Sequence, residues 1–273
     1  MKLSICINLD SRPGVEGEST AFTGHNQGCR NWDFFTHGVA NKRNFFNGFD
    51  TELVAFIDET IRIPDDVMNR VRDLCDCVVV RKHSNSYRNY EVAGFANDIR
   101  YLSCLSQATG EIVFHADADT ACFARDKEAV EAWLSNLESY RFVSYPSPCS
   151  PRPVDDASFG KHTWASTRAF ACKREWLKFD VLERMLREPE WGWEQFGEPV
   201  RRLNWLEHML ALSNNESVIY PPRCDDRLLM FCWSAYHRGV MEKLNGMSFD
   251  DVRDYVRRCG EIQYPNDCVA LPL

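Results

Sequence analysis

The sequence lacks the features that mark most membrane, secreted and nucleic-acid-binding proteins. No apolar run approaches the ~18 residues that a membrane-spanning helix requires. The segment Met1–Asn8 is too short for a signal peptide and contains no small-residue cleavage site. Acidic residues outnumber basic ones by 40 to 32, and this net charge of −8 argues against general nucleic-acid binding, which needs a basic surface. We therefore expect a cytoplasmic protein with no membrane span.

Several catalytic and metal-binding signatures are also missing. The 12 cysteines are scattered singly, the closest two are Cys75 and Cys77, and no Cys-x-x-Cys pair occurs. Without an export signal, we interpret them as reduced thiols that mostly fill the core. The sequence has no Gly-x-Gly-x-x-Gly, Gly-x-x-x-x-Gly-Lys, His-Glu-x-x-His or Gly-x-Ser-x-Gly motif, which argues against the enzyme classes that depend on them.

The composition itself is that of an ordinary globular protein. Hydrophobic residues make up 44% of the 273 positions and charged residues 26%, which is sufficient for a sizeable core. No internal repeat, low-complexity segment or linker divides the chain. We therefore predict a single domain that spans residues 1–273.

Four short apolar runs in the first half predict the strands of a parallel sheet. They are Leu3–Asn8, Glu52–Asp58, Cys77–Arg81 and Glu111–His115. Helical patterns at Asp65–Leu74 and Glu91–Ala108 separate the last three runs. Strands that alternate with helices predict an α/β fold with a mostly parallel central sheet and helices on both faces.

The remaining elements are less regular, and we expect an irregular second half. Trp32–Phe35 is predicted to lie on a helix inside the long first connection. Further helices are predicted at Lys127–Leu137, Leu203–Leu212 and Phe249–Arg258. Phe142–Tyr145 is predicted to be a strand, and the proline-rich segment Pro146–Pro153 a loop.

Two carboxylates follow directly on the fourth predicted strand. Asp117 and Asp119 are two residues apart, so in extended backbone their side chains project to the same side. Such a pair can share one hard divalent cation that keeps open positions for substrate phosphates. Ligands of open α/β sheets bind at the carboxyl ends of strands, where this pair falls. An Asp-x-Asp triplet can also be an ordinary solvated turn, but its place after a central strand favours a site for a metal and a diphosphate.

The segment Gln107–Asp119 resembles the central part of family 2-type glycosyltransferases, which have the nucleotide-diphospho-sugar transferase (GT-A) fold. The resemblance implies that residues 1–125 bind the nucleotide-sugar and that residues 126–273 form the acceptor side. It implies that Asp117 and Asp119 bind Mn²⁺ or Mg²⁺ and the donor diphosphate. The nucleotide-binding positions that it implies are Asn8, Asp10 and Arg12 after the first strand, Asp58 and Glu59 after the second, and Asn97 and Arg100 before the fourth.

The resemblance also implies a catalytic carboxylate at a helix N-terminus in the second half. Glu207 and His208 stand where the family often has Glu-Asp, so either side chain could be the general base, with Glu194 as a further candidate. Glu207 could equally be an ordinary acid of a first helical turn. His237 is a candidate third metal ligand. Side chains suited to binding an acceptor are Trp164, Arg168, Glu194 and Trp205.

Taken together, these features predict a metal-dependent glycosyltransferase that moves a sugar from a nucleotide-diphosphate donor to an acceptor hydroxyl, with inversion expected by analogy. The partners would be the donor and a glycan or other hydroxyl acceptor. Two alternatives remain open. One is a sugar-nucleotide nucleotidyltransferase, and the other is a non-catalytic carbohydrate- or nucleotide-binding protein on the same scaffold.

Overall fold

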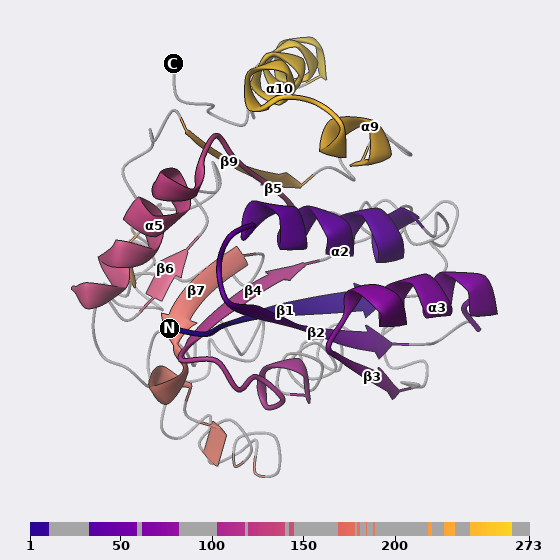
Figure 1. Ribbon diagram of the computed structural model, residues 1–273, viewed down its shortest axis with the longest axis vertical. Coiled ribbons are helices and arrows are strands. Elements are labelled where there is room, and N and C mark those ends of the chain that lie inside the picture. Colours follow the sequence, from indigo (N-terminus) through magenta and orange to yellow (C-terminus); the bar gives the residue numbers. More distant parts are fainter. Residues whose placement is uncertain are drawn as a thin grey trace.

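The computed structural model describes about half of the chain (Figure 1). The described residues are 1–10, 33–58, 62–81, 103–117, 120–139, 142–144, 169–177, 179–180, 184, 188, 218–219, 227–232 and 241–263. Within these ranges no helix is long and apolar enough to cross a membrane. The predicted helix Leu203–Leu212 and the predicted loop Pro146–Pro153 lie outside the described residues.

A seven-stranded sheet forms the centre of the described structure, with the order β3-β2-β1-β4-β7-β6-β8. The strands are β1 (Leu3–Asp10), β2 (Thr51–Asp58), β3 (Cys77–Arg81), β4 (Ile112–Asp117), β6 (Phe142–Ser144), β7 (Ala169–Lys173) and β8 (Val218–Ile219). The four strands predicted in the first half are mutually parallel. Only β7 runs against its neighbours β4 and β6. The prediction of an α/β fold with a mostly parallel sheet is thus confirmed.

The parallel strands are longer at their carboxyl ends than the sequence pattern indicates. β1 was predicted to end at Asn8 and ends at Asp10, and β4 was predicted to end at His115 and ends at Asp117. Pairing explains both extensions, because Asp10 pairs with Asp58 of β2 and Asp117 pairs with Asn8 of β1. These polar residues therefore belong to the sheet itself rather than to the loops after it.

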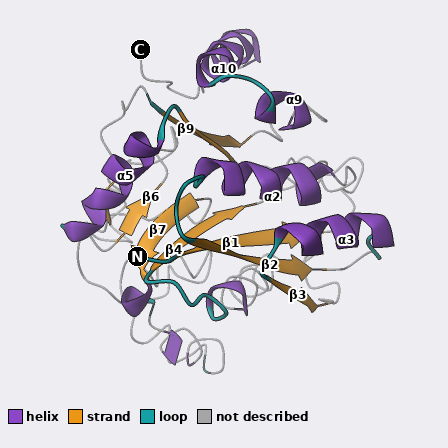
Figure 2. Ribbon diagram, in the orientation of Figure 1, coloured by secondary structure: helices purple, strands orange, loops and turns teal. Residues whose placement is uncertain are grey.

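Helices cover the sheet as the alternating pattern predicts. α2 (Asp33–Phe45) and α3 (Asp65–Leu74) lie over one face (Figure 2). The bounds of α3 match the prediction, because Pro64 precedes its first turn and the apolar residues Val67, Met68 and Val71 form its buried side. Residues 103–105 are helical and approach the other face, since Cys104 Sγ lies 3.7 Å from the carbonyl oxygen of Ile7. The predicted helix Glu91–Ala108 is described from residue 103 and ends at residue 105, before a turn at 106–107.

The second half adds a smaller sheet and further helices. β5 (Thr120–Ala124) pairs antiparallel with β9 (Leu228–Cys232). α5 (Lys127–Ser135) begins at its N-cap Asp126, and a 3₁₀ turn, η3 (Asn136–Glu138), completes the predicted helix. α9 (Met241–Asn245) and α10 (Phe249–Gln263) follow, and η4 (Arg174–Trp176) comes after β7. The observed α10 extends five residues beyond the predicted helix Phe249–Arg258.

The main core lies between the sheet and α2. Alternate residues of β1 (Leu3, Ile5, Ile7 and Leu9) are at most 1% exposed and belong to one cluster with Phe45 and Phe46 of α2. The ring of Phe114 in β4 is 4.9 Å from that of Phe46 and 5.9 Å from that of Trp133 in α5. These aromatic contacts pack α2, β4 and α5 against one another and so fix the position of β4 in the core.

Candidate functional site

Polar residues gather where the parallel strands end. Asn8 of β1 is the register partner of Asp117 in β4, and Asp10 is the register partner of Asp58 in β2. Asp58 in turn is opposite Arg81 of β3. Asn8 and Asp117 thus form one row across the sheet, and Asp10, Asp58 and Arg81 form a second row two residues further towards the carboxyl edge. The structure therefore brings together four of the residues predicted to bind a nucleotide-sugar.

Arg81 is the one of these five positions that the sequence analysis did not single out. It is the last residue of β3 and the only basic residue among the five. Its sequence signal is weak, because a basic residue after an apolar run commonly marks nothing more than a strand end. Only the pairing of β3 with β2 reveals that the backbone of Arg81 lies beside that of Asp58.

Asn8 has an unsatisfied polar atom. Its Oδ1 is shielded from solvent and accepts no hydrogen bond from any residue that the structure describes. A buried acceptor without a partner costs about 1–3 kcal/mol, so native proteins retain such groups sparingly. The atom is thus suited to accept a hydrogen bond from a ligand or to coordinate a hard cation beside Asp117.

The acidic pair lies at the junction of the two sheets. β4 of the large sheet ends at Asp117, and β5 of the small sheet begins at Thr120, so only Ala118 and Asp119 connect them. Thr120 is 1% exposed, and the amide of the next-but-one residue, Cys122, donates to Asn41 Oδ1 at 2.8 Å. The start of β5 is therefore buried and held by a hydrogen bond to α2.

Many of the predicted site residues lie outside the described residues. They are Arg12, Glu59, Asn97, Arg100, Asp119, Trp164, Arg168, Glu194, Trp205, Glu207, His208 and His237. For Asp10, Asp58 and Asp117, and also for Arg81, the structure describes the backbone only. Among the side chains that are described, no group of three or more His, Cys, Asp or Glu could hold a metal ion. The amide oxygen of Asn8 has no hydrogen-bond donor among the described residues, and Asn8 pairs with Asp117 in the sheet. Such an oxygen is a hard ligand that suits Mg²⁺ or Mn²⁺.

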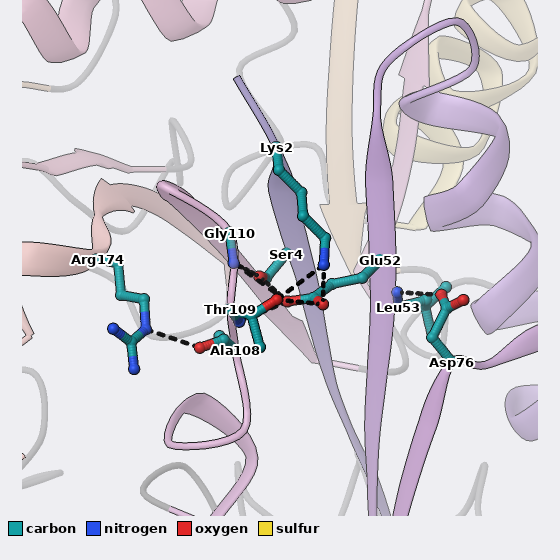
Figure 3. Close-up of polar contacts among 9 residues, drawn as sticks. All are labelled: Lys2, Ser4, Glu52, Leu53, Asp76, Ala108, Thr109, Gly110 and Arg174. Atoms are coloured by element: carbon teal, nitrogen blue, oxygen red, sulfur yellow. Dashed lines mark hydrogen bonds and ion pairs between the residues drawn. The ribbon is translucent and has the colours of Figure 1, made fainter.

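A hydrogen-bonded network closes the opposite, amino edge of the same strands (Figure 3). Its centre is the carboxylate of Glu52, whose side chain is 12% exposed. Lys2 Nζ donates to it at 2.6 Å, the Thr109 amide at 2.5 Å and the Thr109 hydroxyl at 2.6 Å. The Ser4 hydroxyl and the Gly110 amide also donate to it. Burial would raise the pKa of Glu52, but these donors, led by Lys2, outweigh it and lower the pKa to about 2.

This network determines how β4 begins beside β1. The Gly110 amide donates to Ser4 Oγ at 2.7 Å, and the Glu111 amide donates to the Lys2 carbonyl at 2.9 Å. A Cβ on Gly110 would lie 2.7 Å from the Ser4 backbone nitrogen, so only glycine allows this approach. Because β4 is continuous from Ile112 to Asp117, a start fixed here also fixes Asp117 opposite Asn8.

The six cysteines whose side chains the structure describes are free thiols, as expected. Cys6, Cys104, Cys122 and Cys172 are buried, and Cys75 and Cys77 are partly buried. Burial raises the pKa of Cys172 far above its usual value and that of Cys75 to about 12. These thiols are therefore core residues rather than nucleophiles.

The chain is similar to known proteins in structure but not detectably in sequence. No protein-family model and no curated protein matches the chain. It is similar to TarS 1–349 of S. aureus in complex with UDP, with 13% identity and a TM-score of 0.38 over 66% of this chain and 49% of that chain. It is also similar to a cytidylyltransferase from Leptospira borgpetersenii serovar Hardjo-bovis, with 14% identity and a TM-score of 0.47 over 94% of both chains. An active-site mutant of LgtC has 9% identity and a TM-score of 0.45, over 76% of this chain and 70% of that chain.

The chain spans about half the length of the TarS 1–349 structure. All three TM-scores are below 0.5, so the assignment of a function depends on the residues of this chain.

Proposed function

We propose that the protein is a metal-dependent glycosyltransferase that transfers a sugar from a nucleotide-diphosphate donor to an acceptor hydroxyl with inversion. One observation carries the proposal. Asn8 and Asp117 are register partners at the carboxyl edge of the parallel sheet, and Asn8 Oδ1 is buried there without a hydrogen-bond donor among the described residues. An acidic edge with an unsatisfied acceptor suits a cation and a ligand that brings N–H or O–H groups.

In this proposal the polar residues at the carboxyl ends of β1, β2 and β4 hold the donor. Asp10 and Asp58, together with Arg12 and Glu59, would bind the ribose and base, and Asn97 and Arg100 would complete the nucleotide site. Arg81 pairs with Asp58 through the backbone of β3 and would add a basic residue that suits an anionic ligand. Asp117, Asp119 and His237 would hold Mn²⁺ or Mg²⁺, which when bound supplies positive charge for the leaving diphosphate.

The second half would bind the acceptor and start the reaction. Trp164, Arg168, Glu194 and Trp205 are the proposed acceptor-binding residues. Glu207, or else His208, takes the proton of the acceptor hydroxyl as its oxygen bonds to the anomeric carbon. The bond from that carbon to the diphosphate oxygen breaks in the same displacement, and the nucleoside diphosphate leaves with the electron pair. Attack opposite to the leaving group inverts the anomeric centre.

The first test is ligand binding measured by thermal shift. Nucleoside diphosphates and their sugars would be screened with and without Mn²⁺, because a ligand that binds the native state raises the midpoint of unfolding. We expect a Mn²⁺-dependent rise with one nucleotide, and loss of that rise in Asp117→Asn and Asn8→Ala. Asp73→Asn, at an exposed position of α3, is the matched control and should behave as the wild type.

The second test separates the proposed activity from its alternatives. Release of nucleoside diphosphate from the donor that binds would support a glycosyltransferase, and Glu207→Gln should lower turnover far more than donor affinity. Release of pyrophosphate from a nucleoside triphosphate and a sugar phosphate would instead show a nucleotidyltransferase. Binding without turnover of any donor and acceptor pair would show a binding protein.

A further inference from the structure

Asn41 of α2 binds the backbone of β5 with a buried amide. Its Nδ2 donates to the Cys122 carbonyl at 3.0 Å, and its Oδ1 accepts from the Cys122 amide at 2.8 Å. The side chain of Asn41 is 1% exposed. In an antiparallel pair the backbone groups of alternate residues point away from the partner strand. Asn41 therefore binds β5 as a neighbouring strand would, on the edge that faces α2 rather than β9.

The same amide also binds α9. Asn41 Nδ2 donates to Asn245 Oδ1 at 3.1 Å, although the two residues are 204 positions apart in the sequence. Asn245 Nδ2 donates in turn to the carbonyl oxygen of His37, one turn earlier in α2, at 3.1 Å. The oxygen and nitrogen atoms of both side-chain amides thus have partners. These hydrogen bonds join β5, α2 and α9, which lie close together in Figure 1.

β5 continues directly from the acidic edge of the large sheet. Asp117 ends β4 opposite Asn8, Thr120 begins β5, and only two residues connect them. Such a connection spans at most about 11 Å between the Cα atoms of Asp117 and Thr120, so the position of β5 restricts that of the connection. Thr120 is 1% exposed, and Cys122 follows two residues later. The contact with Asn41 therefore acts close to the start of β5.

We propose that Asn41 is a positioning residue that couples α9 to β5 and thereby holds the connection that follows Asp117. It acts through the backbone of Cys122 rather than through contact with the donor. Its consequence for nucleotide binding rests on the proposed function, whereas the coupling between α9 and β5 does not. A connection that is held before a ligand arrives need not be ordered by binding, and this raises the affinity.

Amide hydrogen exchange in the presence of EDTA tests the coupling without metal or nucleotide. Asn41→Ala removes the acceptor of the Cys122 amide, which should exchange at least about tenfold faster. Asn245→Ala leaves that acceptor in place and should still accelerate the same amide about fivefold, because Asn41 loses one of its partners. Val71→Ala is the matched control: it opens space in the buried side of α3 and should leave exchange in β5 unchanged.

Two results of this experiment would overturn the proposal. Wild-type exchange of β5 in Asn245→Ala would show that α9 has no influence on Cys122. Equal acceleration of β2 and β5 in that variant would show general destabilisation instead of coupling. If Asn41→Ala does not fold, Asn245→Asp replaces it in the comparison. This variant keeps the oxygen that accepts from Asn41, so its β5 should exchange more slowly than that of Asn245→Ala.

Calorimetric binding of UDP in the presence of MnCl₂ tests the consequence for the donor site, at a temperature at which every variant is folded. Asn245→Ala should weaken UDP binding about fivefold, and Asn245→Asp should restore most of it. In the background of Asn41→Ala, the same Asn245→Ala substitution should have no further effect, since the contact through which it acts is already lost. Val71→Ala should bind UDP as the wild type does, although it is less stable.

The outcomes separate the positioning role from the proposed function. Equal UDP affinity in Asn245→Ala and the wild type would show that Asn41 supports the fold only, and it would overturn the positioning role. Absence of UDP binding by the wild type would instead count against the proposed function. In that case hydrogen exchange in EDTA still decides whether Asn41 couples α9 to β5.

Discussion

Replacing Glu52 by Gln tests whether the amino edge of the sheet is held by charge. The substitution keeps the size of the side chain and one acceptor oxygen, but it removes the negative charge that Lys2 Nζ contacts at 2.6 Å. The pKa of Glu52 is lowered from 4.5 to about 2, and a tenfold change in proton affinity is worth about 1.4 kcal/mol. Since the side chain is only 12% exposed, screening by solvent is limited, and we expect a loss of about 2–3 kcal/mol in the free energy of unfolding at pH 7.

The sign of the pH dependence follows from the lowered pKa. A carboxylate with a depressed pKa stabilises the folded state fully above its unfolded pKa, and this stabilisation disappears as the pH falls through the folded pKa. For Glu52 the window runs from about pH 4.5 down to about pH 2. The difference between the wild type and Glu52→Gln should therefore be full at pH 7 and should shrink by roughly half at pH 3.

Urea unfolding followed by tryptophan fluorescence and circular dichroism measures this difference. A loss of 2–3 kcal/mol corresponds to a fall in the urea midpoint of about 1 M for a chain of this size. Asp66→Asn is the control, because Asp66 forms an exposed ion pair with Arg70 at 3.0 Å that should contribute less than about 0.5 kcal/mol. A loss below about 0.5 kcal/mol for Glu52→Gln at pH 7, or an equal loss at pH 7 and pH 3, would refute the reasoning.

Three further predictions concern the neighbouring structure. Gly110→Ala should destabilise the protein by about 1–3 kcal/mol, measured as a lower thermal midpoint, because the new Cβ would lie 2.7 Å from backbone of Ser4. Asn41→Ala should lose at least about 2 kcal/mol in urea unfolding, because it leaves both buried backbone groups of Cys122 without their partner. Cys122 should resist iodoacetamide at pH 8 in the folded protein and react once urea unfolds it, since a pKa of about 11 leaves only about one thiolate in a thousand.

The sequence predicted those parts of the fold that local patterns determine. Apolar runs located β1 to β4, and α3 follows directly from Pro64 and the spacing of its buried residues. The position of β7 between β4 and β6 had no local signal, because it depends on a pairing between Ala169–Lys173 and residues more than 50 positions earlier. The extensions of β1 and β4 were missed for the same reason: polar residues are retained in these strands only because a neighbouring strand pairs with them.

Four of the predicted site residues lie at the carboxyl edge of the sheet, but their arrangement could not be predicted from the sequence. Asp58 and Asp117 were recognised because each ends an apolar run, which is a local property. The pairing of Asn8 with Asp117, and of Arg81 with Asp58, depends on the strand order, which the sequence pattern does not contain. The burial of Lys42 could not be predicted either, because a lysine in the last turn of a helix is ordinarily exposed and interacts favourably with the helix dipole.

The polar groups at the two edges of the sheet differ in their hydrogen bonding. We interpret the fully hydrogen-bonded amino edge as a stabilising feature and the carboxyl edge as the candidate binding site. At the amino edge the carboxylate of Glu52 accepts hydrogen bonds from Lys2, Ser4, Thr109 and Gly110, so nothing remains there for a ligand to bind. At the carboxyl edge Asn8 Oδ1 is buried without a donor among the described residues. Proteins tolerate such local defects where a ligand removes them, and they compensate elsewhere in the structure. The Glu52 network is suited to that compensation because it joins the amino ends of β1, β2 and β4, and Asn8, with its unpartnered oxygen, lies near the far end of β1.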